Sequence, residues 1–274
     1  MSRDMSLRDD MKYRMSQSCR IATAIPVWGQ QRLPGDATRS IYLRMSSAFA
    51  RTQWTAAAAT LAAGAAMLLY PGGTARDPGT VGYRMSGNFL SDLGMTVAWD
   101  GRPNRLGAVL FVASMALMIV GIGGALLGFV ARYAGHPRAR RLATLAGALG
   151  VLDCLCFIGV ALAPEDRAMA AHVAFTLAAF RILPLVVFVI TLAAAATPAT
   201  PRAVIGAWAF LTLVLLGYAL MLQGGSWVAT PAGFAAQVIA QKVVAIVMGA
   251  VVVFQSRTAH TLSGRLPRRA PRQT

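Results

Sequence analysis

From about residue 54 onward the chain alternates long apolar runs with short polar segments. Six of the runs carry almost no charge and have about 17 residues or more, the length that an α-helix needs to cross a hydrocarbon core roughly 30 Å thick. The runs cover residues 54–70, 107–129, 142–163, 168–195, 203–222 and 232–254. Their Ala, Leu, Val and Gly content suits helices and not barrel strands, because a helix satisfies its backbone hydrogen bonds within one segment. The pattern predicts an all-α fold, a polytopic six-transmembrane-helix bundle.

The composition agrees with a membrane protein. The mean hydropathy is +0.56 and only 13% of the 274 residues are charged. A net charge of +16 would indicate nucleic-acid binding in a soluble protein. Here, however, nineteen of the 26 Lys and Arg residues lie in the tails and in alternate loops, on one side of the predicted membrane, and five lie in the opposite loops. By the positive-inside rule both termini are cytoplasmic, in a multi-pass protein of the inner or plasma membrane. We expect membrane lipids, and not nucleic acid, as partners of the basic ends.

Three segments follow from this layout. Residues 1–50 are polar, rich in Arg and Met and without periodicity, which predicts a disordered basic cytoplasmic tail. Residues 51–256 form the transmembrane domain, with one long external loop at 71–106, and residues 257–274 form a second basic cytoplasmic tail. Several Met residues, Met45 among them, are candidate initiators, and a chain begun at Met45 would resemble one with a signal peptide. The initiator and the cleavage of the first span both stay open.

The Cys and His residues do not form the patterns that bind metals. Cys154 and Cys156 are about 200° apart around one predicted helix, and Cys19 lies in the tail, so neither a disulfide nor a Cys metal site follows. Of the three His residues only His172 is predicted on the outer side, so one chain cannot assemble a His zinc site there. There is no G-x-S-x-G elbow and no phosphate loop. We expect no metal and no cofactor.

Polar residues gather just before the second span, in the sequence "GNFLSDLG". Asn88, Ser91 and Asp92 fall at positions i, i+3 and i+4, so a helical turn would present all three on one face at the outer mouth of the bundle. Two interpretations remain. Ser91 or Asp92 could cap a short helix that ends at Gly94, or the three side chains could face a ligand.

Further polar residues lie at the outer ends of later spans. Glu165 and Asp166 open the fourth span, where carboxylates cap helices and interact well with the helix dipole. His172 lies about one and a half turns inside that span, either as a hydrogen-bonded packing residue or as a ligand or proton carrier. Gln237 and Gln241 lie one turn apart in the sixth span and extend this polar stripe. All are candidate ligand-binding residues.

Three ionisable residues lie near the middle of their predicted spans. These are Asp153, Arg181 and Lys242. A charge at mid-bilayer costs about 2.5 to 3.5 kcal/mol, so we expect the three to face inward and pair, with Asp153 neutralising Arg181, Lys242 or both. The pair could line a hydrated, outward-facing cavity, or it could be a structural ion pair. His172 and Arg181 are about 180° apart on an ideal helix, so they cannot share one cavity unless Pro184 distorts the helix.

Four short motifs occur in a definite order relative to the spans. "NFLSDLG" follows the first span, "GRPN" leads into the second, "APED" joins the third and fourth, and "QK" lies in the sixth. Over roughly residues 52–256 this order resembles the bacterial six-helix membrane proteins grouped as domain of unknown function 998, and more distantly the Frag/DRAM/Sfk-type membrane proteins of eukaryotes. The resemblance implies a six-helix topology in a bacterial inner membrane. It implies no activity, because that family's function is itself unassigned.

Three hypotheses about function follow. The first is a module that binds or moves a small-molecule or lipid ligand through an outward-facing polar cavity, which requires the three mid-depth charges to converge. The second is a non-catalytic accessory or scaffold protein with a purely structural buried ion-pair network. The third, which the sequence supports least, is an enzyme acting on lipid headgroups. It requires Asp92, Asp166 and His172 within about 3 to 6 Å of one another.

Overall fold

The apolar runs form long helices that lie side by side. The structure is a computed structural model that describes residues 35–133, 136–197, 200–225 and 229–264. The predicted tail at 1–34, which includes Cys19, and residues 265–274 lie outside the described residues. The long helices are α2 (Gly35–Leu69), α3 (Arg105–Arg132), α4 (Pro137–Leu162), α5 (Glu165–Ala195), α6 (Arg202–Gln223) and α7 (Pro231–Gly264).

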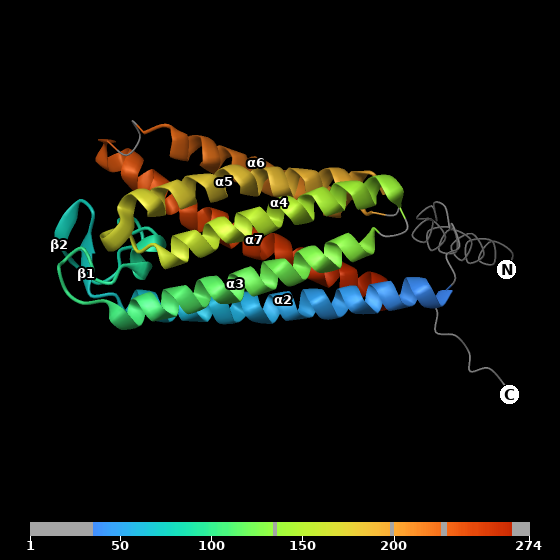
Figure 1. The fold of residues 1–274 in the computed structure, drawn as a ribbon, viewed down its shortest axis with the longest axis horizontal. Coiled ribbons are helices and arrows are strands. Elements are labelled where there is room, and N and C mark those ends of the chain that lie inside the picture. Colours follow the sequence, from blue (N-terminus) through green and yellow to red (C-terminus); the bar gives the residue numbers. More distant parts are fainter. Residues whose placement is uncertain (1–34, 134–135, 198–199, 226–228, 265–274) are drawn as a thin grey trace, which may run out of the picture. The chain divides into compact units, whose positions relative to one another are not determined.

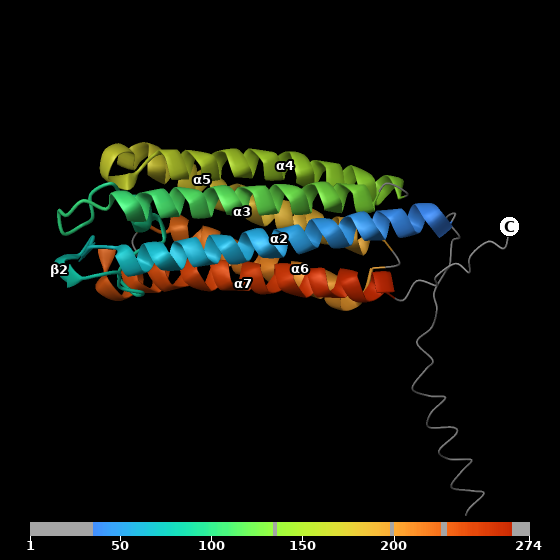
Figure 2. The ribbon, with the colours of Figure 1, turned by 90° about the horizontal axis from the view of Figure 1, so that it is seen from below.

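Neighbouring helices along the chain are also neighbours in space. Each helix packs on the next one in sequence, and α7 packs back on α2, so that the six surround a common interior (Figures 1 and 2). Short connections such as the two residues between α4 and α5 enforce antiparallel neighbours. On α4 the inward stripe consists of small residues at helical spacing and one carboxylate. It contains Ala139, Ala143, Ala146, Gly150 and Asp153.

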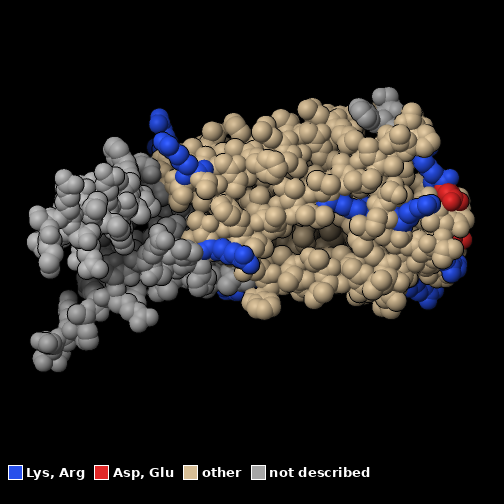
Figure 3. All heavy atoms as spheres, turned by 180° about the vertical axis from the view of Figure 1, so that it is seen from behind, with Lys and Arg blue, Asp and Glu red and all other residues tan. Residues whose placement is uncertain are grey.

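The surface of the helices defines a multi-pass integral membrane protein. Helices α3 to α7 are each long and apolar enough to cross a membrane. Large apolar side chains point outward along them, with Leu127, Leu213 and Ile246 between 68% and 75% exposed. In the view of Figure 3 a broad band of uncharged residues lies between basic residues at the two ends, although some basic atoms lie within it. So much exposed apolar surface is stable only in lipid.

Helix α2 differs from the prediction in two ways. Residues 35–50, which the composition places in the disordered tail, form its first half. Polar and basic side chains do not prevent this, because Ala, Arg, Leu and Met favour helix and no Gly or Pro interrupts residues 36–63. Helix α2 also falls short of the apolar character of the other five. At the other end of the chain, α7 likewise extends through residues 257–264, beyond the predicted start of the C-terminal tail.

The long loop between α2 and α3, which the sequence predicts to be external, is folded rather than extended. Residues 70–104, which we call the cap, contain a hairpin of β1 (Gly72–Thr74) and β2 (Asp77–Val81), paired antiparallel, and a short 3-10 helix η1 (Ser91–Gly94). Figure 1 shows the cap at one end of the helices. An apolar cluster attaches it to α2 and α3. The cluster consists of Ala66, Tyr70, Leu93, Ala98 and Phe111.

Gly73 and Gly101 of the cap share a backbone conformation but differ in the space around them. Gly73 and Gly101 both have a positive φ, of 78° and 82°. A Cβ at Gly73 would run into the backbone of Trp99 and Asp100, whereas a Cβ at Gly101 would meet no atom within 4 Å. We expect Gly73→Ala to cost about 3 kcal/mol or more and Gly101→Ala about 1 kcal/mol. Thermal unfolding in detergent measures both, and equal losses would contradict this packing of the cap.

Candidate functional site

Asn88 is the centre of a polar cluster between the cap and α7. Its Nδ2 donates to Asp92 Oδ2 (2.8 Å) and to the carbonyl oxygen of Gly73 (2.9 Å), and its Oδ1 accepts from the backbone N–H of Arg84 (2.9 Å). The side chain is completely buried. The amide thus joins the hairpin to η1. Of the face predicted for Asn88, Ser91 and Asp92, the structure shows a direct contact between Asn88 and Asp92, while Ser91 is partly exposed and has no hydrogen bond to either of them.

Asp92 is a buried carboxylate with two hydrogen-bond donors on one oxygen. Its Oδ2 accepts from Asn88 and from Nε1 of Trp99 (3.2 Å), and the residue is 2% exposed. Burial, with a smaller contribution from the nearby carboxylate of Glu165, raises the pKa of Asp92 to about 7. The two hydrogen bonds and the charge of Lys242 act in the opposite direction. No side chain caps η1, so the interpretation of Ser91 or Asp92 as its cap is wrong.

Lys242 connects α7 to the cap. Its Nζ donates to the carbonyl oxygen of Asn88 (2.6 Å) and to that of Val238 on its own helix (3.2 Å), and it lies 5.4 Å from the centroid of the Tyr83 ring. A lysine stem can run along a helix and carry its charge toward the membrane surface. The ammonium therefore ends on one carbonyl of the cap and one of its own helix, with only 7% of the residue exposed.

Gln241 makes a second connection between α7 and the cap. Its Oε1 accepts from the backbone N–H of Leu90 (2.7 Å). The ring of Phe89, which precedes Leu90 on the cap, meets the ring of Phe234 on α7 edge to face, with the centroids 5.4 Å apart. The "QK" pair and the "NFLSDLG" segment are therefore parts of one structure.

Asp166 attaches the cap to α5. Its carboxylate accepts from the backbone N–H of Thr96 (2.9 Å), the hydroxyl of Thr96 (2.5 Å) and the backbone N–H of Val97 (3.1 Å). Arg167 lies beside it, with Nε 3.6 Å from Asp166 Oδ2. No side-chain hydrogen bond caps α5, so the capping role predicted for Glu165 and Asp166 is wrong. The carboxylate of Asp166 holds the cap instead.

His172 is a packing residue. Its Nδ1 donates to the carbonyl oxygen of Ala163, 2.8 Å away, and it is 4% exposed. This carbonyl belongs to the last turn of α4, where no further helical N–H can reach it. His172 thus joins the ends of α4 and α5.

The predicted pairing of the mid-depth charges is wrong. In the described part of the chain, Asp153 forms no ion pair with Arg181 or Lys242, and the acidic residues that do pair with Arg are Asp100 with Arg102 and Asp166 with Arg167. Asp153 is 3% exposed and faces the interior, but its Oδ1 has no hydrogen-bond partner. Arg181 is exposed on the outer face of α5, and His172 is buried on the opposite face. Depth along the chain is given by residue number, but the direction of each side chain depends on helix rotation, which uniformly apolar helices do not reveal.

Gln237 and the polar residues of the cluster lie in the interior of the protein, whereas Ser91 and Glu165 are partly exposed. Gln237 is 6% exposed and its Oε1 has no hydrogen-bond partner in the described structure, so the polar stripe reaches the cap only through Gln241. Asn88, Asp92 and Lys242 are buried among protein groups. They therefore do not line an open, outward-facing cavity.

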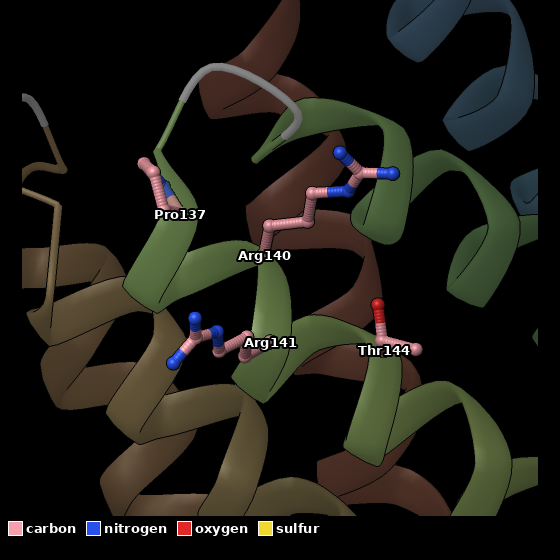
Figure 4. A pocket seen from close by; sticks show the side chains of 4 residues that line it. All are labelled: Pro137, Arg140, Arg141 and Thr144. Carbon is pink, nitrogen blue, oxygen red and sulfur yellow. The ribbon is translucent and has the colours of Figure 1, made fainter.

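A surface hollow at the opposite end of the helices gathers basic residues without forming a binding site. Pro137, Arg140, Arg141 and Thr144 line it, at the start of α4. Figure 4 shows Arg140 extending to one side of the helix and Arg141 to the other. Two guanidinium groups that diverge cannot hold one anion between them. A second hollow, between α6 and α7, has an almost wholly apolar lining.

Four residues of the cluster escape prediction from the sequence. Tyr83 donates its hydroxyl to the carbonyl oxygens of Asn88 (3.0 Å) and Phe89 (3.2 Å), and Asn104 donates from Nδ2 to those of Leu93 (3.1 Å) and Met95 (2.9 Å). The other two are Thr96 and Trp99. An available signal is the presence of aromatic side chains in a Gly- and Pro-rich loop, since Tyr and Trp combine packing area with a polar group.

Comparison of the chain with protein-family models, with curated proteins and with solved structures finds no match in any of the three. Among the described residues no three His, Cys, Asp or Glu side chains gather to hold a metal ion. The fold and the cluster define an integral membrane protein whose membrane-facing helices are closed at one end by a hydrogen-bonded cap.

The raised pKa of Asp92 predicts a pH dependence of stability. Because the folded state binds this proton more tightly than the unfolded chain, its contribution is complete below about pH 4 and is lost as the pH rises through 7. The limiting slope is about 1.4 kcal/mol per pH unit. We expect Asp92→Asn to flatten the dependence of the unfolding free energy on pH between about 4 and 7, and the exposed Asp77→Asn to keep the wild-type slope. An unchanged slope in Asp92→Asn would refute this assignment.

Double-mutant cycles test which carboxylate Lys242 responds to. For Asp153→Asn with Lys242→Met we expect the unfolding free energies to add within about 0.5 kcal/mol, because the two side chains do not interact. For Asp92→Asn with Lys242→Met we expect a coupling above that limit, since the charge of Lys242 acts on Asp92. A coupling energy seen only for the pair of Asp153 and Lys242 would contradict this result and support an ion pair in the interior.

Proposed function

We propose that this chain is a non-catalytic accessory membrane protein, in which six membrane-spanning helices carry a rigid cap on the outer side. One observation supports this most directly: the polar groups that would otherwise serve a ligand or a reaction are buried and engaged with the cap. Asn88, Asp92 and Lys242 are between 0% and 7% exposed. Each of them has hydrogen-bond partners within the protein. The cluster holds a structure together and has no open side.

The six-span topology with cytoplasmic termini is part of this proposal. Helix α2 packs along α3, where Thr52 donates to the carbonyl oxygen of Gly121 (3.1 Å) and Ser114 to that of Ala59 (2.8 Å). Hydrogen bonds of this kind satisfy polar side chains in lipid, so α2 can cross the membrane beside more apolar helices. The excess of Lys and Arg in the tails and in alternate loops supports placing the cap outside.

We also propose that the chain is a member of the family classed as domain of unknown function 998. The motifs that carry the resemblance meet in space. Asn88 binds Lys242, Leu90 binds Gln241, and Asn104 of "GRPN" binds the carbonyl oxygen of Leu93. Motifs that are far apart in sequence but joined by hydrogen bonds stabilise the fold. Proteins that share this fold would therefore be expected to share the motifs.

The two other hypotheses find less support. A ligand-binding module needs polar groups directed at open space, and the groups at the outer end are directed at the cap. An enzyme needs Asp92, Asp166 and His172 to act together, but each is held by a different partner: Asp92 by Asn88 and Trp99, Asp166 by Thr96, and His172 by Ala163.

Hydrogen exchange of the whole protein in lipid nanodiscs tests the rigid cap. We expect the amides of residues 88–98 to exchange as slowly as those of the helices, while the exposed turn at 75–76 exchanges fast. Gln241→Leu removes the acceptor of the Leu90 amide and should speed exchange around it on the order of tenfold. Gln223→Leu is the matched control, because its side chain bonds only to its own helix.

Fast exchange across residues 88–98 in the unmodified protein would contradict the proposal. So would protection that arises only when lipids or metabolites are added, because that result would identify the cap as a ligand-gated opening. Neither outcome depends on any partner protein.

A further inference from the structure

Arg181 is a charged side chain on a surface that faces lipid. It lies in the centre of the outer stripe of α5, with Leu185 (53% exposed) and Phe188 (48% exposed) on the same face. Leu183 and Ile190, on the opposite face, are 5% exposed. In the described part of the chain Arg181 has no hydrogen bond and no ion pair. The residue is exposed.

The depth of Arg181 makes this position costly. It lies 16 residues from Glu165 and 14 from Ala195, at the two ends of α5, which is about 24 and 21 Å along the axis. A hydrocarbon core of roughly 30 Å centred on the helix has its surfaces about 15 Å from this residue. An Arg side chain that snorkels covers only part of that distance. The charge therefore needs a counter-charge within the membrane.

A second copy of the chain cannot supply that counter-charge. Away from the helix ends, Asp153 is the only acidic residue in the described helices, and it is 3% exposed. Glu165 and Asp166 lie at the outer end of α5. Lipid phosphates lie at the membrane surface, beyond the reach of the guanidinium. Charge complementarity thus favours an acidic residue on a membrane helix of a different protein.

The neighbourhood of Arg181 suits a helix that comes close. One and two turns toward the cap, the same face carries Ala178, which is partly exposed, and Ala174, which is exposed. Small residues let helix backbones approach, and in lipid such packing together with polar contacts drives helix association. Leu185 and Phe188 continue the surface on the other side of Arg181.

We propose that the outer face of α5 is a docking surface for a membrane helix of another protein, which carries an Asp or Glu near mid-depth to pair with Arg181. This inference rests on the proposed accessory role and names the class of its partner. The cap and the docking surface involve different residues, so each can fail without the other.

The test uses the full chain in phosphatidylcholine vesicles and synthetic membrane peptides of Leu and Ala with a single central Glu or, as the matched peptide, a central Leu. Energy transfer between labelled protein and labelled peptide measures association. We expect the Glu peptide to bind on the order of tenfold more tightly than the Leu peptide. Arg181→Leu should abolish this preference, Arg181→Lys should keep part of it, and Arg202→Leu, at the end of α6, should leave it intact.

A charge reversal and a stability control complete the test. Arg181→Glu should prefer a peptide with a central Lys over the Glu peptide. Arg181→Leu should melt at or above the wild-type temperature, because it removes an unpaired charge from lipid, so loss of binding cannot be attributed to unfolding. Equal binding of the Glu and Leu peptides by the wild-type chain would overturn the proposal.

The same experiment also tests two other occupants of the outer face of α5. Self-association that disappears in Arg181→Leu would identify a second copy as the occupant and overturn the proposal. Stabilisation of the wild-type chain, and not of Arg181→Leu, by added phosphatidylglycerol, with no preference among peptides, would identify an anionic lipid and also overturn it. If the cap is protected from exchange but the chain binds both peptides equally, the docking proposal fails and the accessory role stands. If the cap exchanges fast, the accessory role itself fails.

Discussion

The contact on which the cap depends is the one between the ammonium of Lys242 and the carbonyl oxygen of Asn88, at 2.6 Å. A lysine on a membrane helix must place its charge where polar groups can surround it. Here the surrounding groups come from the cap: a backbone carbonyl, the ring of Tyr83 and the nearby carboxylate of Asp92. The carbonyl oxygen of Asn88 in turn accepts its hydrogen bond from Lys242, whereas in an open loop at a membrane surface it would accept one from water. The helix and the loop thus satisfy each other.

The other contacts of the cap follow the same logic. Gln241 accepts from a cap amide, Asp166 accepts from Thr96 and Val97, and Asn104 donates to carbonyls on either side of Gly94. Gln241 and Asp166 thus extend from α7 and α5, and Asn104 from the residue just before α3, to an irregular segment whose backbone groups need partners. The cluster is fixed from several sides, which makes it a structural element rather than an open site. This is why the accessory role fits better than binding or catalysis.

The sequence was sufficient to predict the long apolar helices and insufficient to predict most of the contacts between them. Apolar runs located α3 to α7, because membrane thickness sets helix length independently of packing. The i, i+4 spacing of Asn88 and Asp92 correctly predicted their contact, since it is local. The pairing of Asp153 failed because it depends on helix rotation, and on a helix that is apolar on all sides the period of 3.6 residues leaves no visible stripe. The folded cap was missed because its Gly and Pro residues indicate turns but not which turns pair.

The measurement that tests this account most directly is the distance between the cap and α7. Spin labels at position 81 of the exposed hairpin and position 232 at the start of α7, in a chain whose native Cys residues are replaced by Ser, report it by pulsed electron resonance. We expect one narrow distance distribution in the parent chain and a broad one after Lys242→Met. A broad distribution in both, or a narrow one that Lys242→Met leaves unchanged, would contradict the view that this lysine holds the cap in place.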